Sequence, residues 1–296
     1  MTLALEASYQ ACQRLTRRTA RNFYYSFLVL PRDKRRAMSA LYAFLRHTDD
    51  LGDDPAPLAQ RRDALDRWRA SLDAALAGQF DSPILPALVD TVRRYRIPPQ
   101  YLYDVIAGVR MDLDGRVYET FDELLDYCRH VASVVGLACI HIWGFSGGDE
   151  ATSAAQQAGI AFQLTNILRD LKEDVQNGRV YLPNEDLRRF DYSVDDLRAG
   201  LRDERFARLM QFEIDRAEQC YHNAAHLAGY LDRDGRAALG AMTAIYHGLL
   251  NEIRRRDGDV FTRRVALSPW RKLTIAARWF VLGRMSSPRR QSSEAH

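Results

Sequence analysis

Apolar residues recur at three- and four-residue spacing along most of this chain, the pattern of helices that each bury one face. Alternating runs typical of β-strands are nearly absent. The short run 23–30 has a strand-like composition, but Pro31 ends it and a helical pattern follows. The longest periodic segments are 58–76, 121–142, 150–175, 205–231 and 235–255. The sequence therefore predicts an all-α protein.

The breaks between these segments fall at prolines and glycines and do not divide the chain into two compositional halves. Ser193, followed by acidic residues, predicts a helix start. No fixed-period repeat and no low-complexity linker is visible in the 296 residues. We expect one helical domain over 1–285 and a polar, disordered tail over 286–296.

Composition limits the classes of function. A net charge of +3 is too balanced to predict a nucleic-acid partner. The 14 Tyr, 12 Phe and 4 Trp residues are enough to line an apolar cavity. The four cysteines show no CxxC or zinc spacing, and the N-terminus does not resemble a signal peptide, so we expect a cytoplasmic protein. No run of 18 apolar residues predicts a membrane span.

The first acidic cluster reads DDLGDD over 49–54 and ends the helical pattern 35–47. Asp49 and Asp53 are four residues apart, so they share one helix face, and Tyr42 and Arg46 precede them on the same stripe. Like charges at this spacing repel, and a hard divalent cation with oxygen ligands would relieve the repulsion. A lone DDxxD string is more often a solvated helix end, so this cluster alone does not identify a metal site.

The second polar stripe runs along a helix that is otherwise apolar, and buried carboxylates need a partner. One interpretation is a metal site, and the other is a buried salt-bridge network with Arg169 or Lys172. The members of the stripe follow one another at helical spacing: Gln163, Asn166, Asp170 and Asp174.

Two acidic helices that face each other would leave a gap suited to diphosphate chemistry. Mg²⁺ binds one or two carboxylates, keeps several waters and completes its shell with substrate phosphates. Such ions neutralise a diphosphate as its C–O bond breaks. The carbocation left behind needs a dry apolar cavity, and aromatic ring faces attract its charge.

Several motifs together resemble the squalene/phytoene synthase family. The resemblance covers residues 23–270, and the order and spacing agree throughout. The motifs are FYYSF at 23–27, LYAFLR at 41–46 before the first acidic cluster, YETFDEL at 118–124, VASVVG at 131–136, QLTNILRDLKED at 163–174 and GRVYLP at 178–183.

This resemblance implies a single-domain isoprenoid-synthase helical fold around a central apolar cavity. It implies a Mg²⁺-dependent, head-to-head (1′–1) condensation of two identical prenyl diphosphates. Within the family, the FYYSF opening and segment 257–272 look most similar to bacterial hopanoid-pathway enzymes. Those enzymes make presqualene diphosphate from two farnesyl diphosphates, and a second ionisation leads to squalene or a dehydro product.

Other functions remain open. They are a phytoene synthase acting on geranylgeranyl diphosphate, a terpene cyclase or head-to-tail elongase, and a non-catalytic helical assembly factor. The sequence decides neither the C15 or C20 chain length nor the use of NADPH, since no GxGxxG motif is present and relatives that reduce the intermediate lack one. It does not predict the oligomeric state.

Carried over by position, the resemblance implies roles for individual residues. Gly52 departs from the family pattern, where a larger residue is more usual, and Asp54 competes with Asp53 as third acidic ligand; helical spacing favours Asp53 with Asp49. The implied Mg²⁺ ligands are Asp49, Asp50, Asp53, Asn166, Asp170 and Asp174. The implied substrate contacts are Arg46, Arg179 and Tyr181 at the diphosphates, Gln163 beside the metals, and Phe23, Tyr42 and Tyr127 in the reaction cavity. The five aspartates and Tyr42 form the expected catalytic set.

Two further segments carry charged residues outside the predicted site. Asp112 and Asp114 precede Gly115 and are interpreted as an ordinary helix end. Segment 270–284 mixes aromatic, aliphatic and basic residues, as in a helix lying on an anionic membrane surface. A last helix docked on the core explains the same composition.

Overall fold

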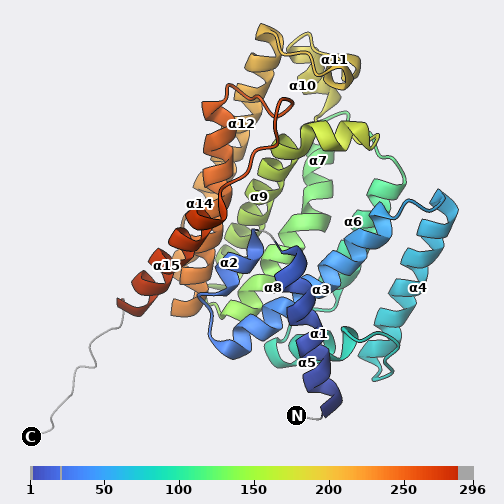
Figure 1. Cartoon of the computed structure of the whole chain (residues 1–296), viewed down its shortest axis with the longest axis vertical. Coiled ribbons are helices and arrows are strands. Elements are labelled where there is room, and N and C mark those ends of the chain that lie inside the picture. Colours follow the sequence, from blue (N-terminus) through green and yellow to red (C-terminus); the bar gives the residue numbers. More distant parts are fainter. Residues whose placement is uncertain (1–2, 21, 286–296) are drawn as a thin grey trace, which may run out of the picture.

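The computed structural model describes residues 3–20 and 22–285, so the predicted tail over 286–296 lies outside the described residues. Helices dominate the described chain, which contains no β-strand and an isolated bridge between Phe145 and Leu231 (Figure 1). The prediction of an all-α, single-domain helical fold is confirmed.

The helices follow one another along the chain with short connections. In order they are α1 (Leu3–Thr19), α2 (Phe23–Phe27), α3 (Arg32–Asp53), α4 (Leu58–Leu76), α5 (Leu85–Tyr95), α6 (Gln100–Leu113), α7 (Phe121–Cys128), the π-helix η1 (Arg129–Ser133), α8 (Val134–Trp143), α9 (Gly148–Gln176), α10 (Asn184–Arg189), α11 (Val194–Ala199), α12 (Glu204–Ala224), α13 (Leu227–Tyr230), α14 (Arg233–Arg255) and α15 (Pro269–Met285).

The long helix α9 organises the bundle. It packs against α8, α12 and α14, whereas α3 packs against α6 and α8 (Figure 1). Helix α8 therefore joins the side of the bundle that carries the first acidic cluster to the side that carries the second.

Helical periodicity located most elements and missed their interruptions. The bounds of α4 agree with the prediction, and Ser193 forms the predicted start of α11 through a capping box with Asp196. The predicted helix 121–142 is interrupted by the π-turn η1. The predicted helix 205–231 is two helices, because α12 ends at Ala224 and the short α13 follows. The strand-like run at 23–30 begins with helix α2, so its composition was misleading.

Two glycines let α9 approach its neighbours closely. A Cβ on Gly159 would lie 2.5 Å from the carbonyl oxygen of Ala132 in η1, and a Cβ on Gly136 would lie 2.7 Å from that of Ala155. Real Cβ atoms cannot come so near, so a larger residue would push the helices apart. These glycines thus let the first half of α9 pack tightly against η1 and α8.

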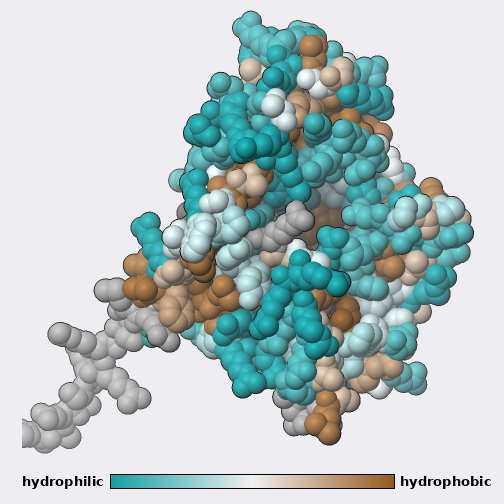
Figure 2. All heavy atoms as spheres, in the orientation of Figure 1, coloured by the Kyte–Doolittle hydropathy of each residue, from teal (hydrophilic) through white to brown (hydrophobic). Residues whose placement is uncertain are grey.

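The last helix, α15, docks on the core and also presents apolar side chains outward. It packs on α14, where a Cβ on Gly240 would collide with the Trp279 ring at 2.5 Å. Trp270, Leu273 and Val281 are exposed on its other side, and hydrophobic spheres gather there in Figure 2. In the described part of the chain, no helix has the length and apolarity needed to cross a membrane.

Candidate active site

A cavity of about 760 Å³ lies between α3, α6, α9 and the segment that follows α14. In Figure 2 the surface is hollowed near the centre of the view, with hydrophilic residues around the opening and hydrophobic residues deeper inside. Both predicted acidic clusters contribute to its walls. The predicted residues that line it are Phe23, Tyr42, Arg46, Asp49, Asp53, Tyr127, Gln163, Asn166, Asp170, Asp174, Arg179 and Tyr181.

The α3 wall carries Asp49 and Asp53, which helical spacing places on one face. Asp50 is not among the described residues that line the cavity. Its carboxylate instead pairs with Arg46, one turn earlier, at 2.5 Å. The helix ends at Asp53, two residues before Pro55, which cannot continue a helix.

The Asp49 side chain is exposed to the open cavity, while the protein atoms around it still desolvate its carboxylate. Burial raises the pKa of its carboxyl group to about 7, and the nearby charge of Asp53 raises it further than Arg46 lowers it. A cation placed between these carboxylates would remove this penalty.

The α9 wall carries the second stripe in the predicted order. Asn166 and Asp170 are partly buried and Gln163 lies one turn earlier. Burial raises the pKa of Asp174 to about 7, and the charge of Asp170 adds to the effect. The amide oxygen of Asn166 is buried and has no hydrogen-bond partner in the described structure.

These donors fit a hard divalent cation. The orphaned amide oxygen of Asn166 lies on the same wall as Asp174, whose carboxyl pKa is raised, and together with Asp170 these oxygens form a ligand set that a cation would satisfy. Within residues 3–20 and 22–285, no group of three or more His, Cys, Asp or Glu side chains is arranged to hold a metal by itself.

Arginines neutralise part of the α9 wall. Arg169 donates to Asp170 with Nε at 2.9 Å, and Arg264 donates to the same carboxylate with Nη2 at 2.8 Å. Burial alone would raise the pKa of Asp170, but these hydrogen bonds and charges lower it. The salt bridge to Arg169 considered from the sequence therefore exists, whereas Lys172 bonds to the Phe261 carbonyl oxygen instead.

Arg179 connects the two acidic helices. Its guanidinium donates to Asp53 at 2.9 Å, and its backbone N–H donates to the carbonyl oxygen of Asp174 at 2.8 Å. This turn after α9 thus brings a fixed positive charge to the α3 wall. Arginines at such a position suit the bidentate recognition of diphosphate oxygens.

The interpretation of Asp112 as an ordinary helix end is wrong. Asp112 lies within α6, lines the cavity and accepts hydrogen bonds from Tyr127 and Tyr181. The sequence did contain a sign of this inward position, because Asp112 follows the buried Val109 by three residues and so shares its helix face. Its neighbour Asp114 is exposed and pairs with Arg62 at 2.6 Å, as an ordinary helix end would.

The close packing of α6 against α3 explains why a glycine stands at position 52, where the family more often has a larger residue. A Cβ at this position would lie 2.6 Å from Cγ1 of Val109 on α6. The absence of a side chain lets α6 approach α3 one turn before Asp112.

The sequence also failed to indicate several other residues that line the cavity, among them Arg264 and Tyr246. Arg264 follows α14 in a loop, where no periodicity marks it. Tyr246 lies among buried apolar residues of α14 and reads as core. Its ring nevertheless lies 5.6 Å from Phe23 and 4.9 Å from Phe162, centroid to centroid.

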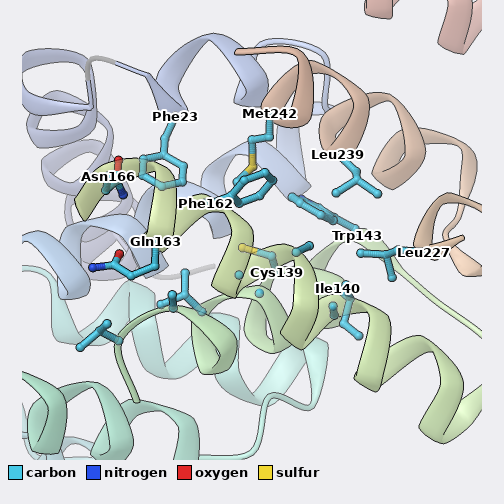
Figure 3. Close-up of a pocket in the computed structure, with 17 residues that line it drawn as sticks. Phe23, Cys139, Ile140, Trp143, Phe162, Gln163, Asn166, Leu227, Leu239 and Met242 are labelled. Carbon is cyan, nitrogen blue, oxygen red and sulfur yellow. The ribbon is translucent and has the colours of Figure 1, made fainter. Parts of the chain in front are cut away.

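Two apolar pockets adjoin the polar cavity and share Gln163 and Asn166 with it. One pocket, of about 240 Å³, extends beneath Tyr42 along α3 and α6. The other, of about 70 Å³, runs between α8, α9 and α14. In Figure 3 the two amides lie at one end of this second pocket, and Trp143 with Leu239 lies at the other. The arrangement suits molecules with an anionic head and an apolar tail.

Comparisons with known proteins agree with this geometry. The family model described as squalene/phytoene synthase matches residues 16–271. The 15-cis-phytoene synthase of Synechocystis is 39% identical over 288 residues, covering 93% of this chain and 86% of the relative. The phytoene synthase of Mycobacterium tuberculosis is 40% identical over 277 residues, covering 92% and 90%.

Solved structures show the same fold. A dehydrosqualene synthase in complex with a ligand superposes with a TM-score of 0.86 at 28% identity, covering 95% of this chain and 98% of that one. A squalene synthase from Alicyclobacillus acidocaldarius gives a TM-score of 0.81 at 31% identity, covering 88% and 98%.

Proposed function

Because this chain belongs to the squalene/phytoene synthase family, and is therefore a prenyl transferase, we propose that it joins two geranylgeranyl diphosphates head to head to form phytoene. The observation that carries the proposal is one polar cavity, walled by acidic residues of α3 and α9, that adjoins two apolar pockets. The two apolar pockets would give each prenyl chain its own site, with both diphosphates sharing one set of cations, and the 70 Å³ pocket must widen to admit a whole chain.

We propose Mg²⁺ as the metal, since the family uses divalent metal ions and the donors here are oxygens. The holding residues would be Asp49 and Asp53 on α3 and Asn166, Asp170 and Asp174 on α9. Asp50 keeps its predicted role only if its pair with Arg46 opens. When bound, the metal ions would neutralise the departing diphosphate.

Protein residues would orient the diphosphates, stabilise the carbocation and exclude water. Arg46 and Arg179 line the polar cavity and would orient the diphosphate oxygens. Phe23, Tyr42 and Tyr246 present aromatic rings where the polar cavity meets the pockets, and ring faces stabilise a nearby allylic cation. The buried pockets exclude water, which would otherwise capture that cation.

The choice of a C20 substrate rests on the relatives named as phytoene synthases, at 38–40% identity over nine-tenths of the chain. The second candidate is the condensation of two farnesyl diphosphates to presqualene diphosphate, and onward to squalene or a dehydro product. The structural neighbours named as dehydrosqualene and squalene synthases favour it at 28% and 31% identity. Phytoene and dehydrosqualene form by proton loss, whereas squalene requires a hydride donor such as NADPH.

Product identification tests this proposal. The protein is incubated with Mg²⁺ and either geranylgeranyl or farnesyl diphosphate, with and without NADPH. We expect a C40 product from geranylgeranyl diphosphate, formed without NADPH and abolished by EDTA. A preference for farnesyl diphosphate would favour the second candidate, and release of no diphosphate from either substrate would contradict both.

We also propose that α15 contacts an anionic membrane surface, into which an apolar product can leave. Trp270 is 76% exposed, and Leu273 and Val281 are exposed beside the basic residues Arg271 and Arg278. The buried Lys272 on the same helix lines the polar cavity, so the first turn of α15 lies beside that cavity.

Sedimentation with vesicles tests the membrane contact. Binding to phosphatidylglycerol-containing vesicles should exceed binding to phosphatidylcholine vesicles and weaken with salt. The W270A/L273A variant should bind roughly threefold or more weakly. Phe80→Ala, which removes an aromatic ring that is 48% exposed on the α4–α5 connection, serves as the control. Equal binding by all three proteins would contradict the proposal.

A further inference from the structure

Asp112 accepts a tyrosine hydrogen bond on each of its two carboxylate oxygens. Tyr181 donates to Oδ1 at 2.8 Å and Tyr127 donates to Oδ2 at 3.0 Å. The two phenol rings stack with centroids 5.1 Å apart and an interplanar angle of 24°. These residues come from α6, from α7 and from the turn that follows α9, so three distant segments meet at one carboxylate.

The surroundings hold this unit in place. Tyr118, which is 1% exposed, lies behind both phenols, with its ring centroid 5.6 Å from that of Tyr127 and 6.1 Å from that of Tyr181. Gly52 lets Val109, one turn before Asp112, pack closely against α3 and so fixes the end of α6. The contact with Tyr118 and the stacking of the two phenols on each other limit the rotation of both rings.

The hydrogen bonds fix where the phenol protons point. Burial raises the pKa of Tyr127 and of Tyr181 far above the ordinary value, so both remain protonated. A phenol has a single proton. Tyr181 directs its proton to Asp112, and the Tyr127 proton has Asp112 at 3.0 Å as its nearer, charged acceptor and the Tyr181 oxygen at 3.4 Å as a second one. Both lone pairs of the Tyr127 oxygen and one of the Tyr181 oxygen are left free to face the cavity that the two residues line.

The unit lies at a mechanistically important place. Asp112 and Tyr127 line both the polar cavity and the 240 Å³ apolar pocket, and Tyr181 lines the polar cavity. Substrate carbon C1, which joins the diphosphate to the prenyl chain, would lie at this junction. Positive charge develops there as the diphosphate leaves.

We propose that Asp112 is a positioning residue, which holds the Tyr127 and Tyr181 hydroxyl groups with their oxygen lone pairs toward the developing carbocation. The inference rests on the proposed prenyl-transfer function. Preorganised dipoles that present their negative ends to a cation stabilise it without reorganisation during the reaction. A hydroxyl proton turned toward the cavity would act in the opposite direction.

The isosteric variant Asp112→Asn tests the proposal. Its amide oxygen accepts from one phenol, but its NH₂ group must donate to the other, whose proton is then released from its fixed direction. We expect kcat to fall roughly 10- to 100-fold while KM changes less than about threefold. Asp114→Asn, on the exposed end of the same helix, is the matched control and should retain wild-type kcat.

A double-mutant comparison shows whether Asp112 acts through the tyrosines. In a Y127F/Y181F background, D112N should lower kcat by no more than about twofold, since the oxygens it positions are gone. The same loss in both backgrounds would mean that Asp112 acts by its charge alone and would overturn the proposal. Wild-type kcat in D112N would also overturn it.

Two further outcomes are distinguishable. Should D112N not fold, as judged by circular dichroism, Y127F/Y181F keeps Asp112 and removes both oxygens; it should then show the same loss of kcat, and full activity would overturn the inference. A wild-type protein that releases no diphosphate from either prenyl substrate contradicts the proposed function itself, and this inference with it.

Discussion

Asp49 and Asp174 belong to different acidic walls of one cavity, and burial together with neighbouring carboxylates raises the pKa of each to about 7. An unfolded aspartate has a pKa of about 3.9. The folded, metal-free protein therefore holds these protons more tightly than the unfolded chain does. The stability they contribute is present below about pH 4 and is lost as the pH rises to about 7.

Magnesium binding should follow the opposite trend, because it requires ionised carboxylates and releases their protons. We expect the rise in Tm produced by Mg²⁺ with inorganic diphosphate to be larger at pH 8 than at pH 6. Calorimetry in two buffers of different ionisation enthalpy should detect proton release near pH 6.5. An equal Mg²⁺-dependent rise in Tm at both pH values would show that these carboxylates do not meet the metal.

Spacing predicted the acidic residues because i, i+4 geometry is local to one helix. It placed Asp49 with Asp53, and Asn166 with Asp170, on the faces that the structure directs into the cavity. It could not find Arg264, because the contact with Asp170 joins residues 94 positions apart in the chain. Such tertiary partners leave no periodic trace in a sequence.

At the scale of elements, the pocket between α8, α9 and α14 is closed at its far end by packed helices. Trp143 at that end is 2% exposed, and its ring lies beside Leu239 in Figure 3. A Cβ on Gly235 would lie 2.5 Å from the Trp143 Cβ, so α14 supports the tryptophan from behind. The far end of this pocket is therefore formed by a large, closely packed side chain.

Trp143→Leu should lengthen the pocket and shift substrate preference toward longer chains. With farnesyl and geranylgeranyl diphosphate in competition, we expect the ratio of kcat/KM values to shift at least about fivefold toward the C20 substrate. The substitution also costs a few kcal/mol of stability through the cavity it leaves. Product ratios measured below the Tm of the variant provide the readout.

Trp68→Leu is the matched control for this prediction. Trp68 is 5% exposed and stacks on Phe44, but it lines none of the three described cavities. It should lose comparable stability and keep the wild-type substrate ratio. Equal ratios of kcat/KM for the two substrates in W143L and the wild type would show that this pocket does not determine the preferred length of the prenyl chain.

Element boundaries show where local patterns stop being informative. The π-turn at Arg129–Ser133 keeps the apolar spacing of its flanking helices, so the sequence pattern predicted one continuous helix there. The Ala132 carbonyl of this turn lies against Gly159 of α9, a tertiary contact that local spacing does not reveal. π-turns often occur at functional sites, and here the adjacent residues line the apolar pockets.

At the scale of the whole molecule, the fold brings two acidic helices to one cavity and leaves apolar space beyond it. The all-α class followed from periodicity, and the family resemblance anticipated the arrangement of the helices. The juxtaposition itself depends on glycines at helix crossings and on Arg179, which reaches from the turn after α9 to Asp53. Close crossings of this kind are set by three-dimensional packing and not by local spacing.

The central claim is that both helices hold the same metal-bound diphosphate. Anomalous diffraction from crystals soaked with Mn²⁺ and an unreactive geranylgeranyl thiodiphosphate tests it most directly. We predict manganese peaks within coordination distance of Asp49 or Asp53 on α3 and of Asn166, Asp170 or Asp174 on α9, with diphosphate oxygens between them and prenyl chains in the apolar pockets. Peaks confined to one helix, or a diphosphate bound outside the cavity, would contradict the account.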